Sequence, residues 1–395
     1  MLSNTPVRPT RPFPEDDAGR LFGMLSTFPP TSCGIATFSA ALSAGLIGNG
    51  DSVHVIRLGS APDLEDSLVL GSLGDGTPES RNKAIDILNR TDVTIIQHEY
   101  GLYDGFDGDD VLSLVEHISV PIMVVAHTVL SEPTANQRRV LEQVCAAADV
   151  VVVMTMTAQS RLLNGYDVEA SKVIVIPHGA ATPLEHEAVT TDRSPGAAPR
   201  LLTWGLLGPG KGIEWAIDAI AELTDLDLPP NYIIAGATHP KIVEHSGEEY
   251  SDMLTDRAAN SAAADHVSFD DSYRDLASLI ELIHSADVVV LPYDSVDQVT
   301  SGVLVDAVAA GRPVISTAFP HAVELLASGA GIVVPQRDPD ALADAIRSVL
   351  TDPDLAASMA AEARRLAPGL SWASVAGRYS ALAGPLVAEP PSVRL

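Results

Sequence analysis

The stretch LLTWGLLGPGKGIEWAIDAIAEL, residues 201–223, contains the unit from which the fold can be predicted. An apolar run at 201–205 leads into a turn with several glycines, and an amphipathic segment follows at 213–223. Continuous apolar runs are typical of strands buried on both faces of a parallel sheet, whereas apolar residues three to four positions apart indicate a helix. The stretch therefore predicts a strand, a glycine-rich turn and a helix.

The same unit recurs along the chain on both sides of this stretch. In the second half, strands are predicted at 201–205, 232–235, 267–269, 288–291, 313–316 and 332–334, and helices at 213–223, 273–284, 302–310 and 339–350. In the first half, strands are predicted at 21–25, 53–56, 93–97, 122–126, 150–154 and 173–176, with helices between them. Alternation of strands and helices predicts doubly wound α/β sheets.

A polar interval separates the two sets of strands. Residues 186–199 have the composition of a linker, and a chain of 395 residues is long enough for two domains. We predict two Rossmann-like, doubly wound parallel-sheet domains, at 21–185 and 200–368, which face each other across a cleft. Residues 1–20 are predicted to be a disordered lead-in, and 369–395 a helix and tail that return to the first domain. Ligands of open α/β sheets bind beyond the carboxyl ends of the strands, so we expect the site in the cleft.

Composition excludes several classes of partner. The net charge of −28 argues against nucleic acid and anionic lipid. The two cysteines, Cys33 and Cys145, form neither a disulfide framework nor a zinc-binding pattern. There is no apolar run of membrane-spanning length and no secretory signal in the polar N-terminus. These features predict a cytoplasmic protein without an integral membrane anchor or a metal.

Two of the predicted strand-to-helix turns have the composition of an anion site. Gly208, Gly210 and Lys211 lie where a helix begins, so backbone amides and an ammonium group could bind a diphosphate. The spacing is not that of a Walker A loop. A solvated lysine is the alternative, but the chain has only four lysines. Gly34 lies at an equivalent turn after the first strand, where it serves either a ligand or the turn itself.

A series of motifs supports a family resemblance. They are PPTSCGIATF at 29–38, QHEYG at 97–101, AHT at 126–128, IPHG at 176–179, AGATHP at 235–240, LPYD at 291–294, QVTSGVLVDAVAAGRPVI at 298–315 and GAGIVVP at 329–335. Together and in this order they resemble the family 4 retaining glycosyltransferases of the GT-B type, over nearly the whole chain.

The resemblance implies roles for residues 298–306. The family has two glutamates with seven residues between them, and the corresponding positions here are Gln298 and Asp306. Asp306 would hold the ribose hydroxyls of the donor, and Gln298 would lie near the transferred sugar, where an amide can bond a hydroxyl but brings no charge. The backbone amides of Thr300, Ser301 and Gly302 would meet the diphosphate or the sugar.

The resemblance also implies roles for a lysine and two histidines. Lys211 would stabilise the leaving diphosphate, although the arginine that the family usually has at position 206 is Leu206 here. His127 would contact the transferred sugar. His98 would contact the acceptor or the loop beneath it, and a structural role for it is an equal alternative. We expect His178 to be structural.

The implied reaction is metal-free, retaining transfer of a hexosyl group from a nucleotide sugar, with GDP-mannose favoured over UDP-glucose and no cofactor. The acceptor would be an oligosaccharide or a glycoside. The departures at Gln298 and Leu206 leave open a non-catalytic nucleotide- or sugar-binding protein, and a nucleotide-sugar epimerase shares the architecture. A glycan phosphorylase would need a lysine for pyridoxal phosphate, and Lys211 and Lys241 lie in the wrong contexts for it.

Overall fold

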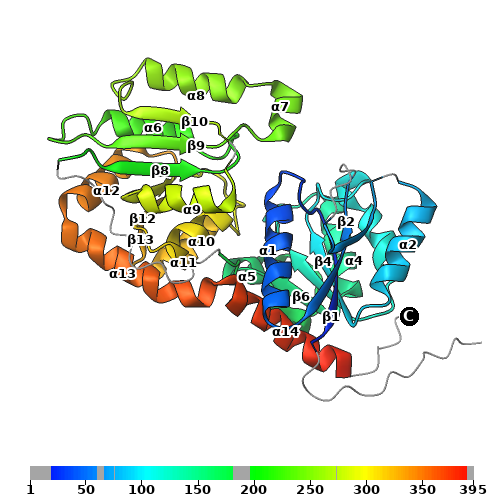
Figure 1. Cartoon of the computed structure of the whole chain (residues 1–395). Helices are drawn as coiled ribbons and strands as arrows, with labels where there is room; N and C mark the ends of the chain where they lie inside the picture. Colours follow the sequence, from blue (N-terminus) through cyan, green and yellow to red (C-terminus); the bar gives the residue numbers. More distant parts are fainter. Residues whose placement is uncertain (1–18, 60–65, 75, 181–195, 273, 389–395) are drawn as a thin grey trace, which may run out of the picture.

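A computed structural model describes residues 19–59, 66–74, 76–180, 196–272 and 274–388. These residues form two α/β domains that lie side by side (Figure 1). Most of the predicted lead-in, residues 186–195 of the predicted linker and the last residues of the predicted tail lie outside the described residues.

The first domain is built on a seven-stranded parallel sheet with the order β3-β2-β1-β4-β5-β6-β7. Its strands are β1 (Leu21–Ser26), β2 (Ser52–Arg57), β3 (Val69–Ser72), β4 (Val93–His98), β5 (Ile122–Ala126), β6 (Val150–Val153) and β7 (Val173–Val175). Its main helices are α1 (Gly34–Gly48), α2 (Pro78–Leu88), α3 (Asp110–Val115), α4 (Ala135–Ala147) and α5 (Met156–Gly165). The strand order reverses between β1 and β4, so the loops after these two strands diverge and leave room for a ligand.

The second domain is built on a six-stranded parallel sheet with the order β10-β9-β8-β11-β12-β13. Its strands are β8 (Arg200–Trp204), β9 (Asn231–Ala235), β10 (Val267–Asp270), β11 (Val288–Leu291), β12 (Val314–Thr317) and β13 (Gly331–Val334). Its helices are α6 (Ile213–Ala221), α7 (Pro240–Ser246), α8 (Glu249–Ala259), α9 (Leu276–Ser285), α10 (Gly302–Ala309), α11 (Pro320–Leu325), α12 (Pro339–Thr351) and α13 (Pro353–Leu370). The predicted class, two doubly wound parallel sheets, is confirmed.

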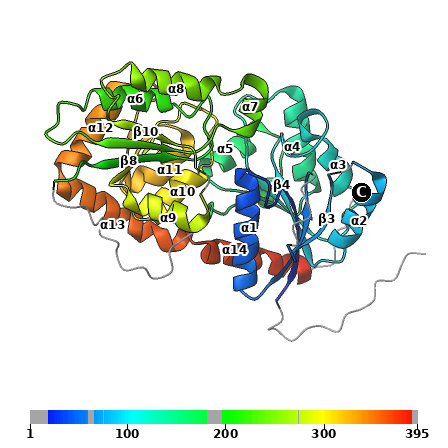
Figure 2. The same cartoon turned by 45° about the horizontal axis from the view of Figure 1, so that its top comes forward.

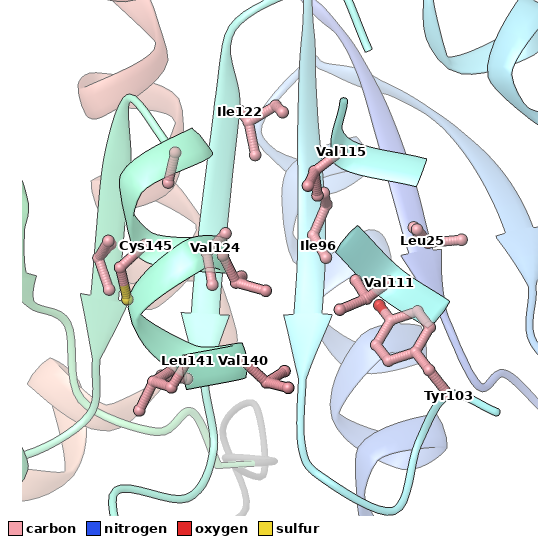
Figure 3. Packing of buried hydrophobic residues seen from close by; sticks show 14 of the residues in the cluster. Leu25, Ile96, Tyr103, Val111, Val115, Ile122, Val124, Val140, Leu141 and Cys145 are labelled. Atoms are coloured by element: carbon pink, nitrogen blue, oxygen red, sulfur yellow. The ribbon is translucent and has the colours of Figure 1, made fainter. Parts of the chain in front are cut away.

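Each sheet is covered on both faces by apolar helix surfaces. One face of the first sheet packs against α3 and α4, whose side chains Val111, Val140 and Leu141 point toward Ile96 and Val124 of the central strands (Figure 3). A second cluster fills the opposite face, and two further clusters do the same in the second domain. Strands buried on both faces explain why the sequence shows continuous apolar runs.

Strand β3 was not predicted from the sequence. It has only four residues, VLGS, it lies at the edge of the sheet, and alternate residues along it are exposed. Such a strand lacks the continuous apolar run that marked its neighbours, because one face of it meets solvent.

The last helix, α14 (Trp372–Ala388), crosses from the second domain to the first. It continues from α13 and lies against α1 (Figures 1 and 2). The backbone of Ala180 bonds to Leu370 (2.7 Å) and to Trp372 (3.3 Å), and Val375 and Tyr379 are buried in the core of the first domain. This crossing ties the two domains together a second time, beside the connection near residue 180.

Polar contacts also join the two domains across the carboxyl ends of their strands. Asp297 accepts hydrogen bonds from Ser131 Oγ (2.7 Å) and pairs with Arg161 (3.0 Å). The carboxylate of Glu324, on α11, accepts from the backbone amides of Met156 (2.8 Å) and Thr157 (3.0 Å) at the start of α5. The loops that follow the strands of both sheets therefore meet at the domain interface, where the sequence places its motifs.

Candidate functional site

The loop between β8 and α6, residues 205–212, has a backbone path that requires glycine. Gly205, Gly210 and Gly212 have φ values of 114°, 90° and 62°. A β-carbon on Gly212 would lie 2.0 Å from the carbonyl oxygen of Pro292, so the loop packs directly on the chain after β11. Beside Gly210 the nearest atom to such a carbon is 3.9 Å away, at Asp294. The loop thus leaves space at Gly210 into which a ligand can approach the backbone.

Lys211 presents a positive charge at this loop. Its Nζ lies 4.4 Å from the centre of the Tyr293 ring, which in turn stacks on Phe319 with ring centres 5.0 Å apart. Among the described residues, no carboxylate lies within ion-pair distance of Lys211, and the side chain is only partly buried. The ammonium is therefore positioned by an aromatic ring and remains available to an anion.

The start of α10 differs in part from the expectation. Ser301 Oγ caps the helix by accepting from Leu304 N (3.2 Å), but the Ser301 amide already donates to His321 Nδ1 (2.9 Å). In this structure the Ser301 amide is thus engaged by a side chain, and its predicted contact with the donor would require His321 to release it. Thr300 Oγ1 is buried and has no hydrogen-bond partner in the described part of the chain.

Gly302 lies where α10 touches the first domain. A β-carbon on Gly302 would be 3.0 Å from His178 Cε1, so only glycine allows this approach without displacement of the ring. His178 is fixed by its Nδ1–H, which donates to the Gly179 carbonyl (2.6 Å). His178 therefore packs against Gly302, and this contact joins the first domain to the start of α10.

Gln298 is folded onto its own loop. Its side-chain amide donates to the Thr300 carbonyl, and its backbone carbonyl accepts from His321 N (3.4 Å). This geometry braces the loop before α10. It does not direct the amide nitrogen toward the first domain, so contact with a transferred sugar would need another rotamer or would use the oxygen.

Four histidines, which we call the histidine cluster, gather near the interface: His98, His127, His178 and His321. Burial lowers the pKa of His98 and His178 to about 4, and that of His127 and His321 to about 3. All four are therefore neutral near pH 7. In this state each ring has one donor and one acceptor nitrogen and adds no charge to the site.

His127 and His98 end adjacent strands of the first sheet. His127 Nε2 bonds to Gln97 Oε1 (2.7 Å), and its ring meets the Phe38 edge, with centres 4.9 Å apart. Phe38 is on α1, the helix that Gly34 begins, and the space beside Gly34 is open. His98 is buried against Tyr100, and its Nδ1 has no hydrogen-bond partner among the described residues. The structure thus brings Gly34, His98 and His127 to one edge of the first sheet.

Asp306 lies in a groove between α9 and α10. The groove is lined by Leu276, Leu279, Ile280, Ile283, His284, Asp306 and Ala310. Asp306 belongs to the second turn of α10, away from the Gly302 contact. Asp306 therefore shares this groove with His284 and with side chains that are otherwise apolar.

Sequence reasoning missed several residues that shape this site. Tyr293 was quoted only within a motif, yet its ring positions Lys211. His321 lies just after β12 and holds the loop before α10. Asp294 and Arg337 form an ion pair, Nε to Oδ2, of 3.0 Å. Each lies beyond the carboxyl end of a predicted strand, and this position was the signal available in the sequence.

The described residues hold no group of three or more His, Cys, Asp or Glu side chains with the arrangement of a metal site. Within the same ranges, none of the helices combines the length and the hydrophobicity that spanning a bilayer requires.

Two family models match consecutive parts of the chain. Residues 33–182 match the model described as Glycosyltransferase Family 4, and residues 191–366 match Glycosyl transferases group 1. Together these matches cover most of both domains.

Similar curated proteins are named D-inositol 3-phosphate glycosyltransferase. The one from Corynebacterium efficiens is 26% identical over 67% of this chain and 65% of its own length. The one from Corynebacterium glutamicum is 27% identical over 68% of each chain, and the one from Geodermatophilus obscurus is 29% identical over 74% of this chain and 69% of its own. The chain therefore aligns with about two thirds of the length of these relatives.

Solved structures share the fold. Anabaena HepE in complex with UDP-glucose superimposes with a TM-score of 0.70 at 15% identity, covering 92% of this chain and 99% of that one. Sucrose-phosphate synthase from Thermosynechococcus elongatus gives a TM-score of 0.72 at 19% identity, covering 93% and 99%. At this level of identity the likeness concerns the arrangement of the two domains.

Proposed function

Since this chain belongs to glycosyltransferase family 4 and has the GT-B fold, we propose that it transfers a hexosyl group from a nucleoside diphosphate sugar to a hydroxyl of a carbohydrate or glycoside acceptor. One observation carries this proposal. The Lys211 ammonium lies over an aromatic ring and has no carboxylate partner in the described residues. It belongs to a loop whose backbone path requires glycine and which opens at the domain interface. Such an arrangement suits an anionic leaving group.

The donor would lie along the second domain. Its diphosphate would meet Lys211 and the backbone at Gly208 and Gly210, and its ribose would reach the Asp306 groove between α9 and α10. The Anabaena HepE structure, which contains UDP-glucose, supports a nucleotide sugar as the donor class. For the base and the sugar we propose GDP-mannose ahead of UDP-glucose, on the sequence variant Gln298 alone.

The proposed chemistry is transfer with retention and without a metal. The bond between the anomeric carbon and the diphosphate oxygen breaks, and the oxygen takes both electrons. Lys211 stabilises the charge that develops there. The acceptor oxygen then bonds to the anomeric carbon on the same face, and its proton passes to the departing diphosphate. The histidine cluster is neutral, so His127 would act as a hydrogen-bonding group toward the sugar and not as a cationic acid.

The acceptor would lie against the first domain, near His98 and His127. The relatives named for inositol 3-phosphate raise the question of a phosphorylated acceptor. Here the arginines on α4 and α5 are already engaged: Arg138 with Glu142, Arg139 with Asp109 and Arg161 with Asp297. We therefore favour a neutral acceptor, and inositol phosphate serves as a test compound.

The free cysteines are consistent with a cytoplasmic location.

The proposal is tested in two steps with the full chain. Thermal shift and calorimetric titration with GDP, UDP, GDP-mannose and UDP-glucose identify the donor, because a ligand that binds the native state raises its melting temperature. The selected donor is then incubated with neutral glycosides or with inositol phosphate, and released nucleoside diphosphate and product are measured. Absence of binding to every nucleotide would refute the proposal.

A second candidate is a nucleotide- or sugar-binding protein without catalysis. The observation that favours it is the Gln298 side chain, which is bonded to its own loop and supplies no carboxylate. Tight nucleotide binding without product, across a panel of acceptors, would select it. An epimerase would instead convert the donor without any acceptor, which NMR of the nucleotide sugar detects.

A further inference from the structure

Arg337 has an unusual backbone conformation beside the Lys211 loop. It lies between β13 and α12, and its φ of 59° is in the left-handed region that glycine normally occupies. Residues with a β-carbon adopt this region at an energetic cost, and such positions cluster at functional sites. We therefore ask which contacts of the Arg337 side chain could offset this cost.

An ion pair directs Arg337 toward the loop after β11. Its Nε lies 3.0 Å from Asp294 Oδ2, and the Asp294 side chain is only 11% exposed whereas that of Arg337 is 65% exposed. Asp294 in turn borders the glycine-rich loop, since its backbone amide donates to the Gly210 carbonyl (3.1 Å). Arg337 thus reaches across β12 to the chain that flanks Lys211.

The neighbouring residue strengthens this link. Gln336 Nε2 donates to the carbonyls of Tyr293 (3.1 Å) and Ser295 (3.2 Å), and the Tyr293 ring carries the Lys211 ammonium. Residues 336 and 337 therefore fix the loop that positions Lys211. The terminal nitrogens of Arg337, Nη1 and Nη2, have no hydrogen-bond partner among the described residues.

We propose that Arg337 supplies a second positive charge to the diphosphate of the donor, which its free Nη groups contact while Asp294 holds its Nε. This inference rests on the proposed function. A nucleotide-sugar diphosphate carries two negative charges and gains another as it leaves, whereas Lys211 offers one positive charge. Asp294 alone would repel the ligand, and an arginine with one nitrogen anchored and two free is suited to bind phosphate oxygens.

The test uses a variant that the backbone favours. Arg337→Gly removes the side chain and suits the left-handed conformation, and the strain that it relieves offsets part of the lost ion pair with Asp294, so the protein should fold with a melting temperature within a few degrees of wild type. We expect the Kd of the preferred nucleoside diphosphate to rise about tenfold or more, and that of the matching monophosphate to change by less than about threefold, because the lost contact involves the diphosphate. The matched control is Arg347→Ala, which removes an arginine on α12 that pairs with Asp225, and it should leave both values unchanged.

The double variant Arg337→Gly with Asp294→Asn separates contact from neutralisation. If Arg337 touches the diphosphate, the affinity stays low in the double variant. Recovery of wild-type affinity would show that Arg337 only masks Asp294, and would overturn the inference. An unchanged diphosphate affinity in Arg337→Gly would overturn it as well. If the wild-type protein binds no nucleotide at all, the proposed function itself fails, and this outcome is distinct from the other two.

Discussion

Replacement of Lys211 by methionine isolates the charge at the glycine-rich loop. Methionine retains most of the apolar stem that lies on the Tyr293 ring, so the substitution removes the ammonium and little else. The neighbouring backbone is determined by glycines on both sides and should keep its path.

The expected cost to the fold is small and the cost to the reaction large. A partly exposed cation over an aromatic ring contributes about 0.5–1 kcal/mol, which shifts the melting temperature of a domain this size by roughly 1–4 °C. Loss of one group that stabilises charge in the transition state typically costs about 3 kcal/mol. At about 1.4 kcal/mol per factor of ten, kcat should fall roughly a hundredfold.

The assay is release of nucleoside diphosphate from the donor that the binding screen selects, with kcat and KM measured separately. Lys172→Met is the matched control, because Lys172 donates to the Ala146 carbonyl within the first domain and should be neutral. If Lys211→Met keeps kcat within a few-fold of wild type while Lys172→Met behaves as expected, Lys211 has no part in stabilising the leaving group. A rise in KM alone would assign it to ground-state binding of the donor.

Other predictions concern the loop, the groove, a metal and pH. Gly212→Ala forces a β-carbon to within 2.0 Å of the Pro292 oxygen at a φ of 62°, so the melting temperature should fall by several degrees, whereas Gly48→Ala, in open space, should not lower it. Asp306→Asn should weaken nucleotide binding by roughly 1.5–3 kcal/mol in calorimetry, and equal affinities would leave the ribose to another group. Activity should survive EDTA. A loss of activity in EDTA that added magnesium or manganese restores would contradict a metal-free site. The histidine cluster has lowered pKa values in the fold, so the unfolded chain binds more protons below about pH 6.5, and urea denaturation should show stability falling from pH 6.5 toward pH 4, by up to about 1.4 kcal/mol per pH unit for each histidine.

Most helices and strands could be predicted from the sequence because the spacing of apolar residues within a short segment differs between the two. Each of the twelve predicted strands matches one of the thirteen strands in the described residues, most of them through a continuous apolar run. The edge strand β3 was missed because its four residues, VLGS, contain no such run. The glycine-rich loop was also recognisable, since positive φ values favour glycine and a lysine at a helix start is uncommon in this chain. The order of the strands within each sheet was not recognisable from these runs.

The sequence by itself determined that two parallel sheets are present and that ligand-binding residues follow their strands. Only the tertiary structure decided what each of these residues contacts: the Ser301 amide is taken by His321, Gly302 lies under His178, and Arg337 reaches Asp294 across β12. The physical reason is that the spacing of apolar residues shows which side of a helix or strand is buried, but not which element it packs against. The partner of a polar side chain depends on which strands become neighbours, and on a domain interface formed by residues more than a hundred positions apart.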